Sequence, residues 1–343
     1  MQDFLLQYGL FLAKTITLLV AVGVAVGGIA GLVREARHID PERLDVEPLN
    51  TRYERMREAL AAELLNADAF KADQKTRKKA AKQRSNERRK RLFVLDFDGD
   101  IAAAQVTELR EEITAILQII EQGDEVLLRL ESEGGMVHGY GLAASQLKRV
   151  RDRGFQLTVA VDKVAASGGY MMACVADTIL AAPFAVVGSI GVVAQLPNFN
   201  RLLKKHDVDF ELHTAGEFKR SITLFGENTD ADRARFQEEL EDTHKLFKMF
   251  VSEHRPQVAI EKVATGEHWF GTRALAIKLV DALKTSDDYL LERAREVDLF
   301  AVRYKRKKPL SERLHFSLLR LASGLRGAPV TALATAAQRR RLF

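Results

Sequence analysis

The stretch FQLTVAVDKVAASGGYMMACVA, residues 155–176, decides the fold. Residues 155–162 form an apolar, β-branched run typical of a buried strand, and SGGYMMACVA is an apolar segment that we expect to be helical. Ser167 therefore follows a strand and precedes a helix. In a parallel sheet flanked by helices, such a junction lies at the carboxyl edge of the strands, where ligands bind.

The same alternation continues upstream. LFVLDF (92–97) and EVLLRL (125–130) predict strands, and the segments after them, 106–120 and 138–152, predict helices. Strand and helix alternate at the spacing of βαβ units, which predicts an α/β fold with a mostly parallel sheet.

The downstream sequence predicts further elements of the same core. FAVV (184–187) and GVVA (191–194) favour buried strands over a second membrane span, because Pro and Gly interrupt the apolar run that contains them. Residues 230–252 predict an amphipathic helix, and residues 269–283 predict another. The side chains expected to face inward from the first helix are Phe236, Leu240, Leu246, Phe247 and Phe250.

The N-terminal region carries a predicted transmembrane helix. Residues 15–33 are nineteen residues without a charge, and at ~1.5 Å per residue they span roughly 28 Å, close to the thickness of the hydrocarbon core. A cleaved signal peptide is the alternative, but this run is longer than the usual apolar region of a signal peptide. Arginines downstream of the span favour a cytoplasmic body by the positive-inside rule, which long domains can override.

Charge is distributed unevenly along the chain. The net charge of +5 combines +9 over residues 71–91 and +10 over residues 303–343 with −14 elsewhere. We expect four parts: an anchor (1–33), a charged stalk or plain linker (34–91), a catalytic body (92–302) and a basic tail (303–343) that is either a membrane-surface helix or disordered. Basic segments of this kind meet anionic lipid or nucleic acid.

Ser167 is the candidate nucleophile. It precedes two glycines that open an apolar helix, so its hydroxyl is expected near converging N–H groups and the positive end of the helix. A second glycine turn, Gly134-Gly135, follows the preceding strand, and the two turns together could form an oxyanion hole. The alternatives are an ordinary serine N-cap and an ordinary turn.

The residues alone do not decide whether a histidine or a lysine is the general base. A Ser-His-Asp triad is compatible with the sequence because its members can be remote, although no histidine lies between His138 and His206. A lysine can serve instead if burial lowers its pKa by about 3 from ~10.4. Lys219, in HTAGEFKRS, follows a predicted strand and is the candidate, with an ordinary surface lysine as the alternative.

Taken together, five motifs resemble the signal peptide peptidase A family of serine peptidases, over roughly residues 92–300. These motifs are LES-x-GG-MV (130–137), DKVAASGGYMMA (162–173), GSIGV (188–192), AGEFKR (215–220) and TGEHWFG with the LVD that follows (265–271 and 279–281). Several spaced motifs in the family's order are far more specific than any one of them.

The resemblance implies a Clp-protease-like, crotonase-type fold and a Ser/Lys dyad. Ser167 matches the nucleophile, Lys219 matches the general base, and Ser189 matches a serine that hydrogen-bonds the lysine. Gly135 and Gly168 match the oxyanion-hole donors.

The resemblance also implies a setting for the reaction. It implies a homo-oligomer whose protomers share active sites, anchored by a single pass in a bacterial inner membrane and in contact with membrane lipid. The implied substrates are hydrophobic peptides, such as signal-peptide remnants or membrane-protein fragments. No cofactor, metal or nucleic-acid partner is implied.

Glu133 departs from the family motif. It stands where the family has proline, which places a carboxylate beside the expected oxyanion hole and removes a constraint on the loop. Reduced activity or altered substrate choice is the expectation.

Two other functions fit parts of the sequence. A non-catalytic membrane scaffold would bind lipid or nucleic acid through its basic segments. A DxDG phosphatase would use Asp96, but the Thr that usually follows the glycine of that motif is missing. Ser145 and Lys148 form an S-x-x-K without its companion motifs, and Cys174 is expected in the core.

Overall fold

The computed structural model describes residues 8–19, 22–23, 43–84, 89–216, 219 and 222–306 of the 343-residue chain. The chain divides into two units, one formed by Met1–Arg43 with Lys305–Phe343 and the other by Leu44–Tyr304. The second unit takes in part of the segment expected to be a stalk.

Residues 8–19 and 22–23 are helical. No helix within the described ranges is both long and apolar enough to cross a bilayer. The span predicted over residues 15–33 lies mainly outside those ranges, and the tail beyond residue 306 lies wholly outside them.

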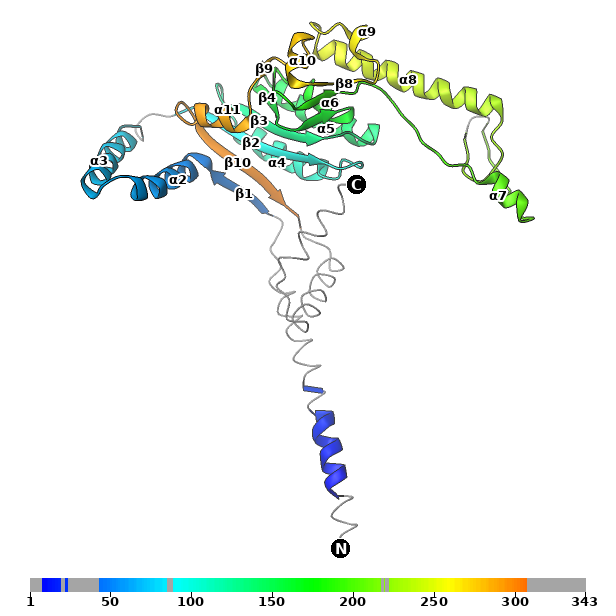
Figure 1. Ribbon diagram of the computed structural model, residues 1–343, viewed down its shortest axis with the longest axis horizontal. Coiled ribbons are helices and arrows are strands. Elements are labelled where there is room, and N and C mark those ends of the chain that lie inside the picture. The colour runs from blue at the N-terminus through cyan, green and yellow to red at the C-terminus, as the bar shows by residue number, and fades with distance from the viewer. Residues whose placement is uncertain are drawn as a thin grey trace. The chain divides into compact units, whose positions relative to one another are not determined.

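A largely parallel sheet forms the centre of Leu44–Tyr304 (Figure 1). In the described part of the chain it has ten strands, and its main path runs β1-β10-β2-β3-β4-β6-β9. β5 pairs with β3 and β7, and β8 joins β7 as the antiparallel partner. The strands are β1 (Arg43–Pro48), β2 (Arg91–Gly99), β3 (Glu125–Ser132), β4 (Gln156–Val161), β5 (Val164–Ala166), β6 (Thr178–Ala181), β7 (Val186–Gly188), β8 (His268–Phe270), β9 (Ala282–Leu283) and β10 (Asp298–Lys305).

Apolar side chains cover both faces of the central strands. In β2, Phe93, Leu95 and Phe97 belong to one hydrophobic cluster, while Leu92 and Val94 belong to another. Burial on both faces explains why this strand is a continuous apolar run instead of an alternating one. The α/β fold with a mostly parallel sheet is therefore confirmed.

Helices cover both clusters. α4 (Val106–Ile119), α5 (Val137–Arg151) and α6 (Gly168–Ala173) supply side chains to the first cluster, and α8 (Asp230–His254) packs on α6. α2 (Leu49–Leu64) and α11 (Ser286–Arg293) supply Leu49 and Leu290 to the second. The short helices are α7 (Asn200–Lys205), α9 (Ile260–Val263) and α10 (Gly271–Ala276). The strands and helices predicted between residues 92 and 173 are confirmed.

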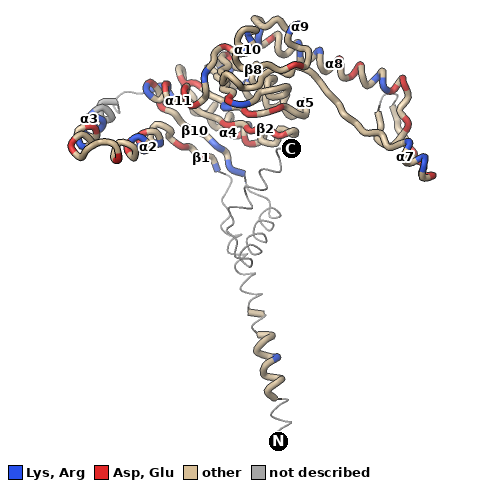
Figure 2. Tube along the Cα trace, viewed as in Figure 1, with Lys and Arg blue, Asp and Glu red and all other residues tan. Residues whose placement is uncertain are grey.

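Much of the segment expected to be a stalk is helical. α2 and α3 (Ala67–Arg84) are joined by ion pairs, in which Arg57 binds Asp73 through two hydrogen bonds of 2.8 and 2.7 Å and Arg77 binds Glu54. Figure 2 shows charged residues of both signs along α2. β1 and the start of α2 nevertheless join the folded unit, because Leu49 is buried and Asn50 donates to Ala294 O and Val297 O.

Three expectations downstream were wrong in detail. GVVA (191–194) forms no strand, and its Val193 is 80% exposed. The helix expected over 269–283 is interrupted, because α10 ends at Ala276 and Lys278 adopts a left-handed backbone conformation at φ +63°. On α8, which begins at the capping box of Thr229, Phe247 is buried but Leu246 is 59% exposed.

Candidate active site

Ser167 occupies a sharp turn between β5 and α6. Its backbone is left-handed, at φ +51° and ψ −118°, a conformation that is unfavourable for a non-glycine residue. The Ser167 N–H donates to Gly188 O at 2.8 Å and the Ser167 carbonyl accepts from Met171 N at 3.0 Å, so bonds on both sides hold the turn.

The hydroxyl of Ser167 makes no capping hydrogen bond to α6, although the residue is the N-cap of that helix. The interpretation of Ser167 as an ordinary N-cap is therefore wrong, because such a cap accepts from an N–H of the first turn. Within the described residues this hydroxyl makes no hydrogen bond to a histidine or a lysine either. A half-buried hydroxyl on a strained turn is thus left available for chemistry.

The two glycine turns lie against each other. A Cβ placed on Gly134 would come within 2.7 Å of both Gly168 N and Ser167 Cβ, so the two loops touch at the candidate nucleophile. The parallel pairing of β3 with β5, which sets Ser132 opposite Ala165, brings the loops together. The sequence analysis raised this juxtaposition as the condition for an oxyanion hole.

Two backbone N–H groups are available in these loops. Gly168 is the first residue of α6, where N–H groups have no acceptor within the helix. Gly135 lies in the loop before α5, and in the described part of the chain its N–H donates to no protein acceptor. Gly134 differs, because its N–H donates to Ser132 Oγ at 3.0 Å. A carbonyl oxygen bound beside Ser167 could accept from Gly135 and Gly168.

Ser189 follows β7 and lies next to the Ser167 turn. Its backbone is also left-handed, at φ +51°, and its N–H donates to Glu267 O at 2.7 Å. Because the preceding residue, Gly188, accepts from Ser167 N, the two serine turns are joined through the backbone. Ser189 is half-buried.

Lys219 lies in the long connection between β7 and α8. Its side chain is exposed, and its N–H donates to Gly216 O at 3.2 Å. Figure 1 shows α7 of this connection near the N-terminal end of α8, whereas Phe247 and Val251, near the other end of α8, share a hydrophobic cluster with the side chains of α6. The 25 residues of α8 span about 37 Å. A single chain therefore brings together Ser167, Ser189 and the glycine loops and leaves Lys219 exposed.

Two buried residues that the sequence did not single out, Ser132 and Tyr140, lie beneath the glycine loop. Ser132 Oγ is 2.5 Å from Tyr140 Oη, and both side chains are almost fully buried. The position of Ser132 two residues before the glycine pair was a usable signal. Tyr140 gave none, because its contacts arise only in the folded chain.

The reactive side chains of the competing motifs are paired with other residues or buried. Asp96 pairs with Arg129 at 2.6 Å and with Arg303 at 3.0 Å, so it is not a free nucleophile. In the S-x-x-K motif, Ser145 donates to Gly141 O and Lys148 pairs with Asp152. Cys174 is buried, and burial raises the pKa of its thiol far above the usual value.

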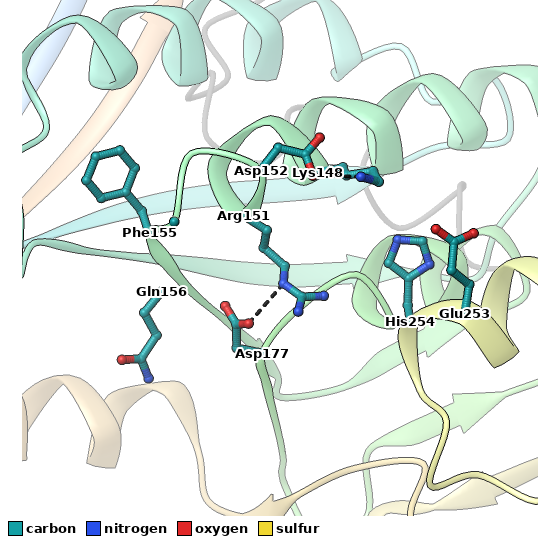
Figure 3. Close-up of a pocket in the computed structure, with 9 residues that line it drawn as sticks. Lys148, Arg151, Asp152, Phe155, Gln156, Asp177, Glu253 and His254 are labelled. Carbon is teal, nitrogen blue, oxygen red and sulfur yellow. Dashed lines mark hydrogen bonds and ion pairs between the residues drawn. The ribbon is translucent and has the colours of Figure 1, made fainter.

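A cavity of about 580 Å³ lies away from Ser167, between the carboxyl ends of α5 and α8 and the start of β4 (Figure 3). Its cations are paired with its own carboxylates: Lys148 with Asp152 at 2.6 Å and Arg151 with Asp177 at 2.9 Å. Ser167, Ser189 and the glycine loops do not line this cavity, so it is separate from the candidate site.

The chain matches family models over most of its length. Residues 3–147 match the model "Peptidase family S49 N-terminal" and residues 149–299 match the model "Peptidase family S49". A protein described as "Probable protease SohB" from Haemophilus influenzae is 50% identical, over 90% of this chain and 92% of its own length. A protein of the same description from Buchnera aphidicola subsp. Acyrthosiphon pisum is 60% identical, over 67% of this chain and 68% of its own.

Among solved structures, a mutant of the "1510-N membrane-bound stomatin-specific protease" superposes with a TM-score of 0.42 and 12% identity, over 60% of this chain and 86% of that one. The family resemblance predicted from the motifs is confirmed by the sequence relatives. The chain belongs to peptidase family S49 and is a serine-type peptidase.

Proposed function

We propose that this peptidase is a membrane-anchored endopeptidase that cleaves hydrophobic peptides with a Ser167/Lys219 dyad. The observation that carries the proposal is the Ser167 turn, a strained residue at the start of α6 with an uncapped hydroxyl, in contact with the Gly134 loop. That arrangement suits a nucleophile whose reaction develops negative charge on oxygen.

The proposed reaction passes through an acyl-enzyme. Ser167 Oγ attacks the peptide carbonyl carbon and its proton passes to the Lys219 amine, while the N–H groups of Gly135 and Gly168 hold the oxyanion. The lysine then gives the proton to the leaving amine as the carbon–nitrogen bond breaks. Water next attacks the acyl group, its proton passes to the lysine and on to Ser167 Oγ, and a carboxylic acid is released. Ser189 orients the lysine by a hydrogen bond.

A second copy of the chain is part of the proposal. An amine acts as a base at neutral pH only when it is kept from water, and Lys219 is exposed in the single chain. The connection that carries it has further exposed apolar side chains, among them Val193, Leu202 and Phe210. Packing of this connection on a neighbouring copy would cover these side chains and bring Lys219 to the neighbour's Ser167.

The membrane location and the fold type are also part of the proposal. The charge-free run over 15–33 supports a single-pass anchor in a bacterial inner membrane, and the basic segments support contact with anionic lipid, with the body on the cytoplasmic side. Digestion of intact and lysed cells with an added protease tests the side. Branching of β5 and β7 from the parallel sheet supports the Clp-protease-like, crotonase-type fold.

Mixing inactive variants tests the shared dyad. The detergent-solubilised full chain should cleave a fluorogenic apolar peptide, and Ser167→Ala and Lys219→Ala should each abolish turnover. Lys205→Ala removes another exposed lysine of the same connection and should retain activity. If active sites are shared, a mixture of the two inactive variants should regain part of the activity. Equal activity in all variants would refute the dyad and leave the scaffold function.

A further inference from the structure

A chain of buried hydrogen bonds runs beneath the glycine loop. Tyr140 Oη donates to Asp100 O at 2.7 Å, which uses its single proton. With that proton used, we assign the 2.5 Å contact between Ser132 Oγ and Tyr140 Oη to donation by the serine, whose other acceptor, Gly99 O, is farther away at 3.4 Å. Ser132 Oγ accepts in turn from Gly134 N–H at 3.0 Å. The bonds therefore point one way, from Gly134 through Ser132 and Tyr140 to Asp100, and such chains reinforce one another.

Burial makes this chain a fixed support. Tyr140 is 0% exposed and Ser132 is 2% exposed, so water cannot replace either partner. Burial also raises the pKa of Tyr140, so its hydroxyl keeps the proton that it donates. The chain is close to Gly99 as well, because a Cβ there would lie 2.5 Å from Tyr140 Oη and 2.6 Å from Ser132 Oγ.

This chain of hydrogen bonds engages one N–H of the glycine loop and leaves the next one free. Gly134 N–H is committed to Ser132, so the adjacent Gly135 N–H remains for a ligand. The ring of Tyr140 reaches the other donor, because a Cβ on Gly168 would lie 2.4 Å from Tyr140 Cγ. One tyrosine thus supports the loop of Gly135 with its hydroxyl and the backbone of Gly168 with its ring.

We infer that Ser132 and Tyr140 are positioning residues that hold the two oxyanion donors, Gly135 and Gly168, at the separation and direction that the reaction requires. This inference rests on the proposed function of Ser167 and deepens it. Neither side chain touches the substrate, so both act through the backbone they support. Their effect is on stabilisation of the oxyanion, and binding of the ground-state peptide is expected to be unaffected.

Tyr140→Phe removes the hydroxyl and keeps the ring. We expect kcat to fall by about 10- to 100-fold, with KM changed by less than about twofold. A peptide aldehyde forms a tetrahedral adduct with the nucleophilic serine, whose oxygen occupies the oxyanion hole, so its inhibition constant should rise by the same factor as kcat falls. A merely structural role would not couple these two quantities.

Tyr170→Phe is the matched control. Tyr170 is also 0% exposed and also donates to a backbone carbonyl, Leu279 O at 2.8 Å, but it takes no part in the glycine loop. It should lose about as much stability, roughly 1 kcal/mol, while keeping kcat and aldehyde affinity within about twofold of the parent.

Ser132→Ala gives a second measurement of the same chain. Because both residues act through Gly134, we expect the double variant with Tyr140→Phe to lose little more kcat than the worse single variant. The inference is overturned if Tyr140→Phe and Ser132→Ala match Tyr170→Phe in kcat and aldehyde affinity while the parent remains active. Failure of the proposed function is distinguishable, because the parent itself would then cleave no peptide or Ser167→Ala would stay active.

Discussion

Replacement of Gly134 by alanine tests whether the two glycine loops must touch. Gly134 has φ +93°, which costs a residue with a Cβ about 1–2 kcal/mol. The new Cβ would lie 2.7 Å from Gly168 N, 2.7 Å from Ser167 Cβ and 2.8 Å from Ala166 O. Most of these atoms belong to the backbone and cannot rotate away, so the loops must separate, at a further cost of about 1–3 kcal/mol.

The expected total for Gly134→Ala is about 2–5 kcal/mol of unfolding free energy. Gly154→Ala is the matched control, because Gly154 has φ +79° but a Cβ there would meet no atom within 4 Å beyond its immediate chain neighbours. It should lose only the backbone part, about 1–2 kcal/mol. The difference between the two variants isolates the steric contact with the Ser167 turn.

Urea unfolding of the solubilised chain measures both losses, and cleavage of a fluorogenic peptide measures activity. A displacement of about 1 Å between nucleophile and oxyanion donors should lower kcat/KM by about 100-fold in Gly134→Ala. Gly154→Ala should keep the activity of the parent. If the two variants lose the same stability and both stay active, the contact between the loops does not matter for catalysis.

Three further substitutions test other parts of the account. Glu112 is buried and accepts from Tyr304 N, and burial raises its pKa from 4.5 to about 7. The protonated Glu112 carboxyl is favoured in the folded state, so the stability that it contributes is complete below pH 4.5 and is lost as the pH rises to about 7. In urea titrations, Glu112→Gln should therefore be more stable than the parent by up to about 3 kcal/mol at pH 8 and equal to it at pH 4. An equal difference at both pH values would contradict this. Glu133 is exposed next to Gly134, and Glu133→Pro should leave peptide cleavage unchanged or raise it, because proline restricts the loop; a clear loss of activity would show that the carboxylate is needed. Arg255 is 2% exposed and binds both oxygens of Asp281 at 2.8 Å, so Arg255→Ala should lower the unfolding free energy by about 1.5–3 kcal/mol by removing these charged hydrogen bonds, while Asp281, which is partly exposed, still accepts from Ile179 N; a loss below about 1 kcal/mol would refute a structural role.

The central strands and helices were predictable because their signals are local. β2, α4, β3 and α5 each carry an apolar pattern of the right period, and their order specifies parallel pairing. GVVA (191–194) shows where such signals fail. A β-branched run favours a strand, but only a neighbouring strand can pair with it, and Val193 is instead exposed.

The candidate site also has a part that the sequence predicted and a part that only the folded structure shows. Ser167 and the glycine turns were identified because strand–turn–helix junctions collect at one edge of a parallel sheet. The contact between the turns also needs the pairing of Ser132 with Ala165, which no local pattern specifies. The Ser132–Tyr140 chain depends on three separate segments, so composition and spacing could not predict it.

The structure of a single chain does not give the environment that Lys219 would need as a base. Its motif selects it as the base, yet its exposure in the single chain is opposite to what a base requires. In the proposed shared site another copy completes the environment of Lys219, and the sequence around the lysine carries no signal of that environment.

Labelling by a fluorophosphonate tests the central claim most directly. Such a probe forms a covalent bond to an activated serine, and trypsin would release Ser167 and Ser189 in one peptide, residues 164–201, so fragmentation in a mass spectrometer must locate the adduct. We predict the added mass on Ser167 of the parent chain and its absence from Ser167→Ala. An adduct on Ser189, or continued peptide cleavage by Ser167→Ala, would contradict the assignment of Ser167 as the nucleophile.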